Sequence, residues 1–161
     1  MNEAHLHLLV NHLPIILPIV GVIVAIIGLI SKSEEVKRTA LLLFIFGAIG
    51  AFAAMATGEG AEEVVEHING VTKNYIHEHE EKAELFALTS YVLGVLSVIA
   101  LWASFKQKAF SYKIYVAVFV FAFVVLFFGA QTGTTGGEIR HTEIRSEAPA
   151  NGHAQSSVDK D

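Results

Sequence analysis

The sequence predicts an all-α fold, an integral membrane four-helix bundle. Of its 161 residues, 53% are hydrophobic and 17% are charged, and the mean hydropathy is +0.52. That composition is too apolar for an ordinary soluble domain of this length. Four apolar runs are each long enough to cross a bilayer, which takes about 20 residues. Basic residues gather in the two short connections between runs, which is typical of a multi-span membrane protein.

The predicted transmembrane domain covers residues 1–145, with spans at about 8–30, 39–57, 83–104 and 114–133. The first span lies near the N-terminus, but it lacks a basic leader and is too long for a cleaved signal sequence. Pro14 suits the first turn of that helix, where a missing N–H does no harm, so the helix is predicted to begin near Leu13. In the fourth span, glycines predict a helix end near Gly133. Residues 146–161 are polar, without hydrophobic periodicity, and are predicted to form a disordered tail.

The charge distribution predicts an orientation. The two short connections hold Lys32, Lys37, Arg38, Lys106, Lys108 and Lys113, and such an excess marks the cytoplasmic side. Only Glu34 and Glu35 of the sixteen acidic residues then lie inside, so the other fourteen and all eight histidines lie outside. The sequence therefore predicts a multi-pass protein of the bacterial inner membrane with both termini outside the cytoplasm. Helices two and three are expected to extend beyond the outer membrane face.

Composition excludes several kinds of site. The chain has no cysteine, which excludes disulfides, thiolate metal sites, iron–sulfur clusters and a covalent c-type haem. The predicted outer face has no basic patch, so no nucleic-acid partner is expected. Any bound metal must therefore use histidine, carboxylate or backbone oxygen.

Histidines fall at two depths at the predicted outer end. With a rise of about 1.5 Å per residue, His12 lies at the outer hydrocarbon boundary, level with Glu59 and Glu84. A second layer lies about 10–14 Å further out if the helices continue. It holds one histidine from each of four chain segments: His5, His67, His79 and His141. Four separate segments thus bring imidazoles towards one end of the bundle.

Carboxylates accompany these histidines at helical spacings. Glu63 precedes His67 by four residues, which places both on one helix face. Glu138 precedes His141 by three, the E-x-x-H spacing that metal-binding helical bundles use. The predicted cofactor ligands are His12, His67, His79 and His141, and a metal ion could also use Glu59, Glu63, Glu84 or Glu138. In the alternative interpretation His12 only caps its helix, and the charges of His77–Glu81 form a solvated face.

Short motifs along the chain resemble the bacterial membrane family labelled domain of unknown function 2231. They are NHLPI (Asn11–Ile15), TGEGAEE (Thr57–Glu63), a histidine leading into the third span, and GGEIRH (Gly136–His141). The resemblance covers about residues 5–145 and implies a four-span fold. Because that family sometimes occurs fused to cytochrome c domains, the resemblance also implies a redox setting.

The leading hypothesis is a haem or transition-metal site at the periplasmic mouth of the bundle that serves redox chemistry or electron transfer. Haem b would be held by two imidazoles, whereas iron, zinc or copper would use histidines and carboxylates together. Expected partners are the lipid bilayer and respiratory or cytochrome proteins. The alternatives are a structural subunit of a membrane complex without a cofactor, and a proton- or ion-handling protein. The sequence assigns no catalytic residue and no reaction.

Overall fold

A computed structural model describes residues 2–68 and 70–145 of the chain. Its helices are α1 (Glu3–Val10), α2 (Leu13–Ile30), α3 (Glu34–Val65), α4 (Lys73–Phe105), α5 (Ser111–Arg140) and the short 3-10 helix η1 (Thr142–Ile144). The α1–α2 pair, α3, α4 and α5 are each long and apolar enough to cross a membrane. The predicted all-α membrane fold with four spans is therefore confirmed for the described residues. The tail predicted at 146–161 lies outside them.

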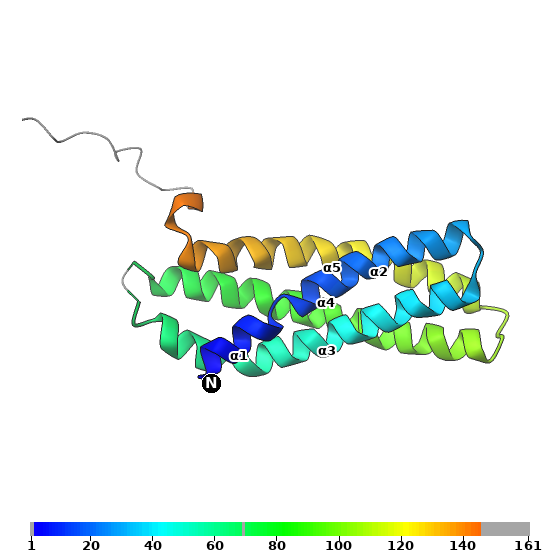
Figure 1. Cartoon of the computed structure of the whole chain (residues 1–161), viewed down its shortest axis with the longest axis horizontal. Coiled ribbons are helices and arrows are strands. Elements are labelled where there is room, and N and C mark those ends of the chain that lie inside the picture. Colours follow the sequence, from blue (N-terminus) through cyan, green and yellow to red (C-terminus); the bar gives the residue numbers. More distant parts are fainter. Residues whose placement is uncertain (1, 69, 146–161) are drawn as a thin grey trace, which may run out of the picture.

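The long helices run antiparallel, so the bundle has two chemically different ends (Figure 1). We call the end with the α2–α3 and α4–α5 connections the lysine end; it carries Lys32, Lys37, Arg38, Lys106, Lys108 and Lys113. The N-terminus, the α3–α4 connection and the end of α5 lie at the opposite end (Figure 1). We call it the histidine end, and it carries His5, His7, His12, His67, His77, His79 and His141. Which end faces the cytoplasm remains a prediction from the charge pattern.

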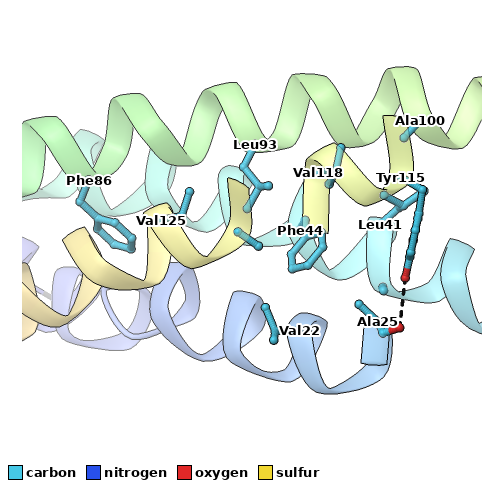
Figure 2. Close-up of a cluster of buried hydrophobic side chains, with 12 residues drawn as sticks. Val22, Ala25, Leu41, Phe44, Phe86, Leu93, Ala100, Tyr115, Val118 and Val125 are labelled. Carbon is cyan, nitrogen blue, oxygen red and sulfur yellow. Dashed lines mark hydrogen bonds between the residues drawn. The ribbon is translucent and has the colours of Figure 1, made fainter. Parts of the chain in front are cut away.

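The helices form a closed ring in which α2 and α4 each pack against both α3 and α5. Figure 2 shows the apolar cluster between them, in which Phe44, Leu93 and Val118 are almost completely buried. Close helix contact depends on small residues, because membrane helices associate through packing. A Cβ atom added to Gly94 would lie only 2.5 Å from the Cβ of Ala48, which fixes the approach of α4 to α3.

The first predicted span is broken into two helices at Asn11 and His12. Pro14 has no N–H to donate to the carbonyl of Val10, so this helical hydrogen bond is missing at the break. Helix α2 begins at Leu13, with Pro14 in its first turn, as predicted. The residues before the break form α1, which packs along α3. A single helix over residues 8–30 was therefore wrong at its first residues, and the break sets the direction of α1.

Two other helix ends also differ from the prediction. Helix α5 does not end near Gly133 but continues through the glycines to Arg140. The glycines serve close packing there, since a Cβ on Gly129 would lie 3.0 Å from the Phe86 ring. Helix α3 ends at Val65, so His67 lies beyond the helix that carries Glu63.

The two central helices are longer than a bilayer requires. Helices α3 and α4 contain 32 and 33 residues, which corresponds to lengths of about 48–50 Å against a hydrocarbon core of about 30 Å. Each must therefore project from the membrane at one end or at both. The predicted extension of these two helices agrees with their length.

Candidate functional site

His7 is held against α3 by a hydrogen bond that fixes its tautomer. Its Nδ1 atom lies 3.1 Å from the carbonyl oxygen of Ala54 and 3.1 Å from Oγ1 of Thr57. A carbonyl oxygen can only accept, so Nδ1 must carry the hydrogen that it donates. In the neutral ring the lone pair then belongs to Nε2. The side chain is half-buried between α1 and α3.

His79 is held against α5 in the same way. Its Nδ1 lies 3.1 Å from Oγ1 of Thr135. The Thr135 hydroxyl also has two carbonyl oxygens of its own helix within reach, Gln131 at 3.3 Å and Thr132 at 3.2 Å. When its hydrogen goes to either carbonyl, the Thr135 oxygen accepts from Nδ1 of His79. In that tautomer the neutral ring has its lone pair on Nε2, as in His7.

Gly136 of α5 leaves the space into which the His79 ring of α4 packs. A Cβ atom on Gly136 would lie 2.9 Å from Cε1 of the His79 ring, closer than real Cβ contacts allow. One turn away, Thr132 donates from Oγ1 to the carbonyl of Lys82 at 3.0 Å, which ties α5 to α4 beside the imidazole. These contacts hold the ring in a defined orientation.

Both imidazoles belong to the histidine end, with His7 on α1 held against α3 and His79 on α4 held against α5. Among residues 2–68 and 70–145, no hydrogen bond engages Nε2 of either His7 or His79. Both imidazoles are therefore anchored through Nδ1, and Nε2 of each makes no hydrogen bond in the described part of the chain.

The residues predicted around His12 lie on the surface. His12 is the residue before the first turn of α2, and its side chain makes no capping hydrogen bond. Glu59 and Glu84 are exposed, on α3 and α4. Within the described part of the chain, no hydrogen bond or ion pair joins His12 to either carboxylate.

His67 and Glu63 also face the solvent. The Nδ1 atom of His67 lies 2.8 Å from the backbone carbonyl of Glu63, and both side chains are exposed. This contact is a helix-end hydrogen bond that leaves the Glu63 carboxylate unused. On α4, exposed His77 lies near the carboxylates of Glu80 and Glu81, at 3.7 and 3.4 Å, and so faces away from His7.

His141 pairs with a carboxylate other than the predicted one. Its Nδ1 lies 2.9 Å from Oε1 of Glu143, whereas Glu138 remains part of α5. The pKa of the Glu143 carboxyl lies below its usual range, first because its own backbone N–H donates to it and then because His141 does. Both partners are exposed, so the pair belongs to the surface.

Among the residues that the structure describes, no three histidine or acidic side chains converge closely enough to hold a metal ion. What the helices fix instead is the orientation of His7 against α3 and of His79 against α5. Of these, His7 was not among the predicted ligands. The sequence gives little indication of this, because His5 and His7 lie two residues apart and point to different faces of a helix, and the spacing does not say which face is buried. Only the packing of α1 on α3 shows that His7 faces the bundle and His5 the solvent.

Comparisons with known proteins give a family and no assigned activity. Residues 3–143 match the family described as "Predicted membrane protein (DUF2231)". No curated protein and no solved structure matches the chain. The match covers all four candidate spans and both imidazoles of the site.

Proposed function

The chain belongs to the DUF2231 family of predicted membrane proteins, and we propose that it binds a transition-metal ion or haem iron through Nε2 of His7 and Nε2 of His79. The role proposed for the bound metal is electron transfer at the histidine end of the bundle. In the orientation that the charge pattern predicts, this end faces the periplasm of a bacterial inner membrane. Respiratory or cytochrome proteins are the proposed partners.

One observation carries this proposal: each imidazole is anchored by a hydrogen bond at Nδ1, and Nε2 of each makes no hydrogen bond among the described residues. Metal-binding histidines nearly always donate their other ring N–H to a carbonyl, carboxylate or similar acceptor, which fixes the tautomer and aims the ligand atom. Ala54 and Thr57 do this for His7, and Thr135 does it for His79. The two anchors come from different helices, so the fold itself holds both rings.

The donor set suits a metal that accepts neutral nitrogen. Imidazole is a good ligand for iron, copper, zinc and nickel, and axial histidine also holds haem iron. A bound haem iron or copper ion would supply a one-electron redox couple. The predicted Glu59, Glu63 and Glu84 are exposed and would have to leave the surface to join the site. A site of two imidazoles, with His12 available as a third, requires less rearrangement.

The middle of the bundle argues against the alternative of proton or ion conduction. Its buried hydroxyls, on Ser90 and Ser97, donate to carbonyls of their own helix at 2.8 and 2.7 Å. A conducting path normally needs ionisable groups at mid-depth. Around Ser90 and Ser97 the buried neighbours are apolar, with Leu93 between them.

The direct test is the cofactor content of the untagged full chain, measured by metal analysis and by an optical spectrum. Haem gives an intense Soret band, whereas a single metal ion does not. We expect His7→Ala and His79→Ala each to lower occupancy at least tenfold, while the helical content stays unchanged. His77→Ala is the matched control, because it removes an exposed imidazole from the same helix, and it should leave occupancy within twofold.

The same measurement tests the ligands predicted from the sequence. We expect His67→Ala and His141→Ala to keep most of the bound metal, and His12→Ala to lose no more than part of it. His12→Asn distinguishes a cap from a ligand, since asparagine can cap a helix but replaces imidazole poorly at a metal. Protein that contains no metal or haem under any loading condition would refute the proposal and favour the structural subunit.

A further inference from the structure

A second polar site lies at the lysine end, between α3, α4 and α5. It is a surface pocket lined by charged, hydroxyl and small apolar side chains: Glu34, Lys37, Leu41, Ala100, Ser104, Ser111, Tyr112 and Tyr115. It does not involve the histidines or the residues around them. The pocket lies where the four spans end, next to exposed Trp102 and Phe105, at the level that interfacial aromatic residues occupy in membrane proteins.

Lys37 is the centre of this pocket. The residue is only 8% exposed, and its ammonium group lies 5.4 Å from the centre of the Tyr112 ring and 5.9 Å from that of Tyr115. Its Nζ donates to Oε1 of Glu34 at 2.7 Å. An ammonium group has three hydrogens to donate. Among the described residues Glu34 is the acceptor for one of them, so two remain for a ligand.

The surroundings of Lys37 favour an anion. Among the described residues, the hydroxyls of Ser111 and Tyr112 make no hydrogen bond, and both line the pocket. The Glu34 side chain is 58% exposed, so its carboxylate can leave Lys37 without disturbing the core. Six basic residues against two acidic ones give this end four excess positive charges. An oxyanion could thus replace the Glu34 carboxylate on Lys37.

We propose that the pocket binds the phosphate of an anionic phospholipid headgroup. The phosphate oxygens accept from Lys37 and from the hydroxyls of Ser111 and Tyr112, and the acyl chains lie along the apolar outer surface of the bundle. A lipid fits better than a soluble phosphate because the pocket opens at the membrane surface. Basic pockets between membrane helices are known to hold such headgroups.

The chain carries a built-in reporter, since Trp102 is its only tryptophan and lies at the lysine end, under the ammonium of Lys108 at 5.7 Å. The full chain is reconstituted into phosphatidylcholine vesicles that contain phosphatidylglycerol with brominated acyl chains, which quench tryptophan fluorescence. The comparison vesicles carry the bromine on phosphatidylcholine instead. Preferential quenching by brominated phosphatidylglycerol measures the preference for the anionic lipid.

Four variants separate the pocket from general surface charge. Lys37→Met is expected to lower the preference about fivefold, whereas Lys106→Met, which removes an exposed charge from the same end, should change it less than twofold. Tyr112→Phe keeps the ring over Lys37 but removes the hydroxyl, and should lower the preference about twofold. Glu34→Gln removes the competing carboxylate and should raise it.

Equal losses from Lys37→Met and Lys106→Met would overturn the proposal in favour of diffuse attraction to the surface. A lower preference after Glu34→Gln would also overturn it, because the carboxylate would then help to bind the lipid. Inorganic phosphate at millimolar concentration should leave the quenching unchanged; if it displaces the lipid, the site belongs to a soluble anion. Should Lys37→Met not fold, Tyr112→Phe and Glu34→Gln decide the question alone.

Discussion

The two ends of the bundle use their polar side chains differently. At the lysine end, Arg38 donates to Oγ of Ser104 at 3.0 Å and to Glu35 at 2.8 Å, and its guanidinium lies 4.4 Å from the centre of the Phe105 ring. The ends of α3 and α4 are thereby tied together. At the histidine end, His7 and His79 are oriented just as firmly, but each through only one of its two nitrogens.

This difference separates groups that stabilise the fold from groups that remain available. Arg38 makes three hydrogen bonds inside the protein, to Oγ and the carbonyl oxygen of Ser104 and to Glu35, and these contacts stabilise the fold. The two imidazoles are anchored and still able to bind, and Asn11, at the helix break nearby, has a buried side-chain oxygen without a partner among the described residues. Oriented but unused ligand atoms are what a binding site requires. The histidine end is therefore where we place the function.

The largest expected effect concerns the anchor of His79. Thr135→Val keeps the shape of the side chain but removes the oxygen that is hydrogen-bonded to Nδ1 of His79, and loss of such an outer partner typically costs about 10–100-fold in metal affinity. Thr134→Val is the matched control, because the Thr134 hydroxyl bonds only its own helix at Ala130. Metal titration of both variants measures the effect. Equal affinities would show that the hydrogen bond does not orient a ligand.

The lysine end should respond in stability instead. Arg38→Ala removes hydrogen bonds from a charged, largely buried group and should lower the free energy of unfolding by about 2 kcal/mol. Arg140→Ala, at an exposed position of α5, should change it by no more than about 0.5 kcal/mol. Unfolding in bicelles or nanodiscs measures both. If Arg38→Ala protein stays folded but loses bound metal, the contacts at the lysine end would affect metal binding at the histidine end, contrary to our interpretation.

Acid should release the metal. A proton competes for the Nε2 lone pair, so metal is retained where the imidazole is neutral and lost as the pH falls below the ordinary imidazole range, about 6.5. We expect retention after dialysis to be roughly tenfold or more lower at pH 5 than at pH 8. Equal retention at both values would argue against histidine ligands. Among the described residues, the lysine end carries no histidine.

Arg145 links the end of α5 to the α3–α4 connection at the histidine end. Its guanidinium donates to the carbonyls of Glu138 at 2.8 Å, Ile139 at 3.1 Å and Gly70 at 3.0 Å, and it lies 4.2 Å from the centre of the Tyr75 ring. Lysine cannot reproduce this fork, so Arg145→Lys should lower stability by about 1 kcal/mol. Hydrogen exchange should speed up mainly in the α3–α4 connection. Unchanged hydrogen exchange in this connection would mean that the Arg145 hydrogen bonds do not stabilise it.

The smallest effects concern the turns, and they have opposite signs at the two ends. Gln107 follows α4 at the lysine end with φ of 48°, where glycine is the favoured residue, so Gln107→Gly should raise stability by up to about 1 kcal/mol. Gly70, at the histidine end, has φ of 87°, and Gly70→Ala should lower stability by about 1 kcal/mol. Thermal unfolding compares the two. Shifts of the same sign would show that these turns do not control the local stability.

The sequence by itself determined the fold class, the four spans, the start of α2 at Leu13 and the gathering of histidines at one end. Hydrophobic length and charge distribution along the chain are sufficient for these, because a bilayer imposes them on any spanning helix. The family resemblance read from short motifs also agrees with the family that matches residues 3–143.

Tertiary structure alone decided which histidine faces the bundle. From the sequence, His79 was placed among the ligands and His5 in the outer layer of histidines, but His7, two residues further along the same short helix, was not singled out. The break at Pro14 redirects α1 onto α3, so that His7 reaches Ala54 and Thr57. Packing also explains why α5 continues as a helix past Gly133: the His79 ring packs into the space that Gly136 leaves. Such contacts join residues about 50 positions apart, and no local periodicity encodes them.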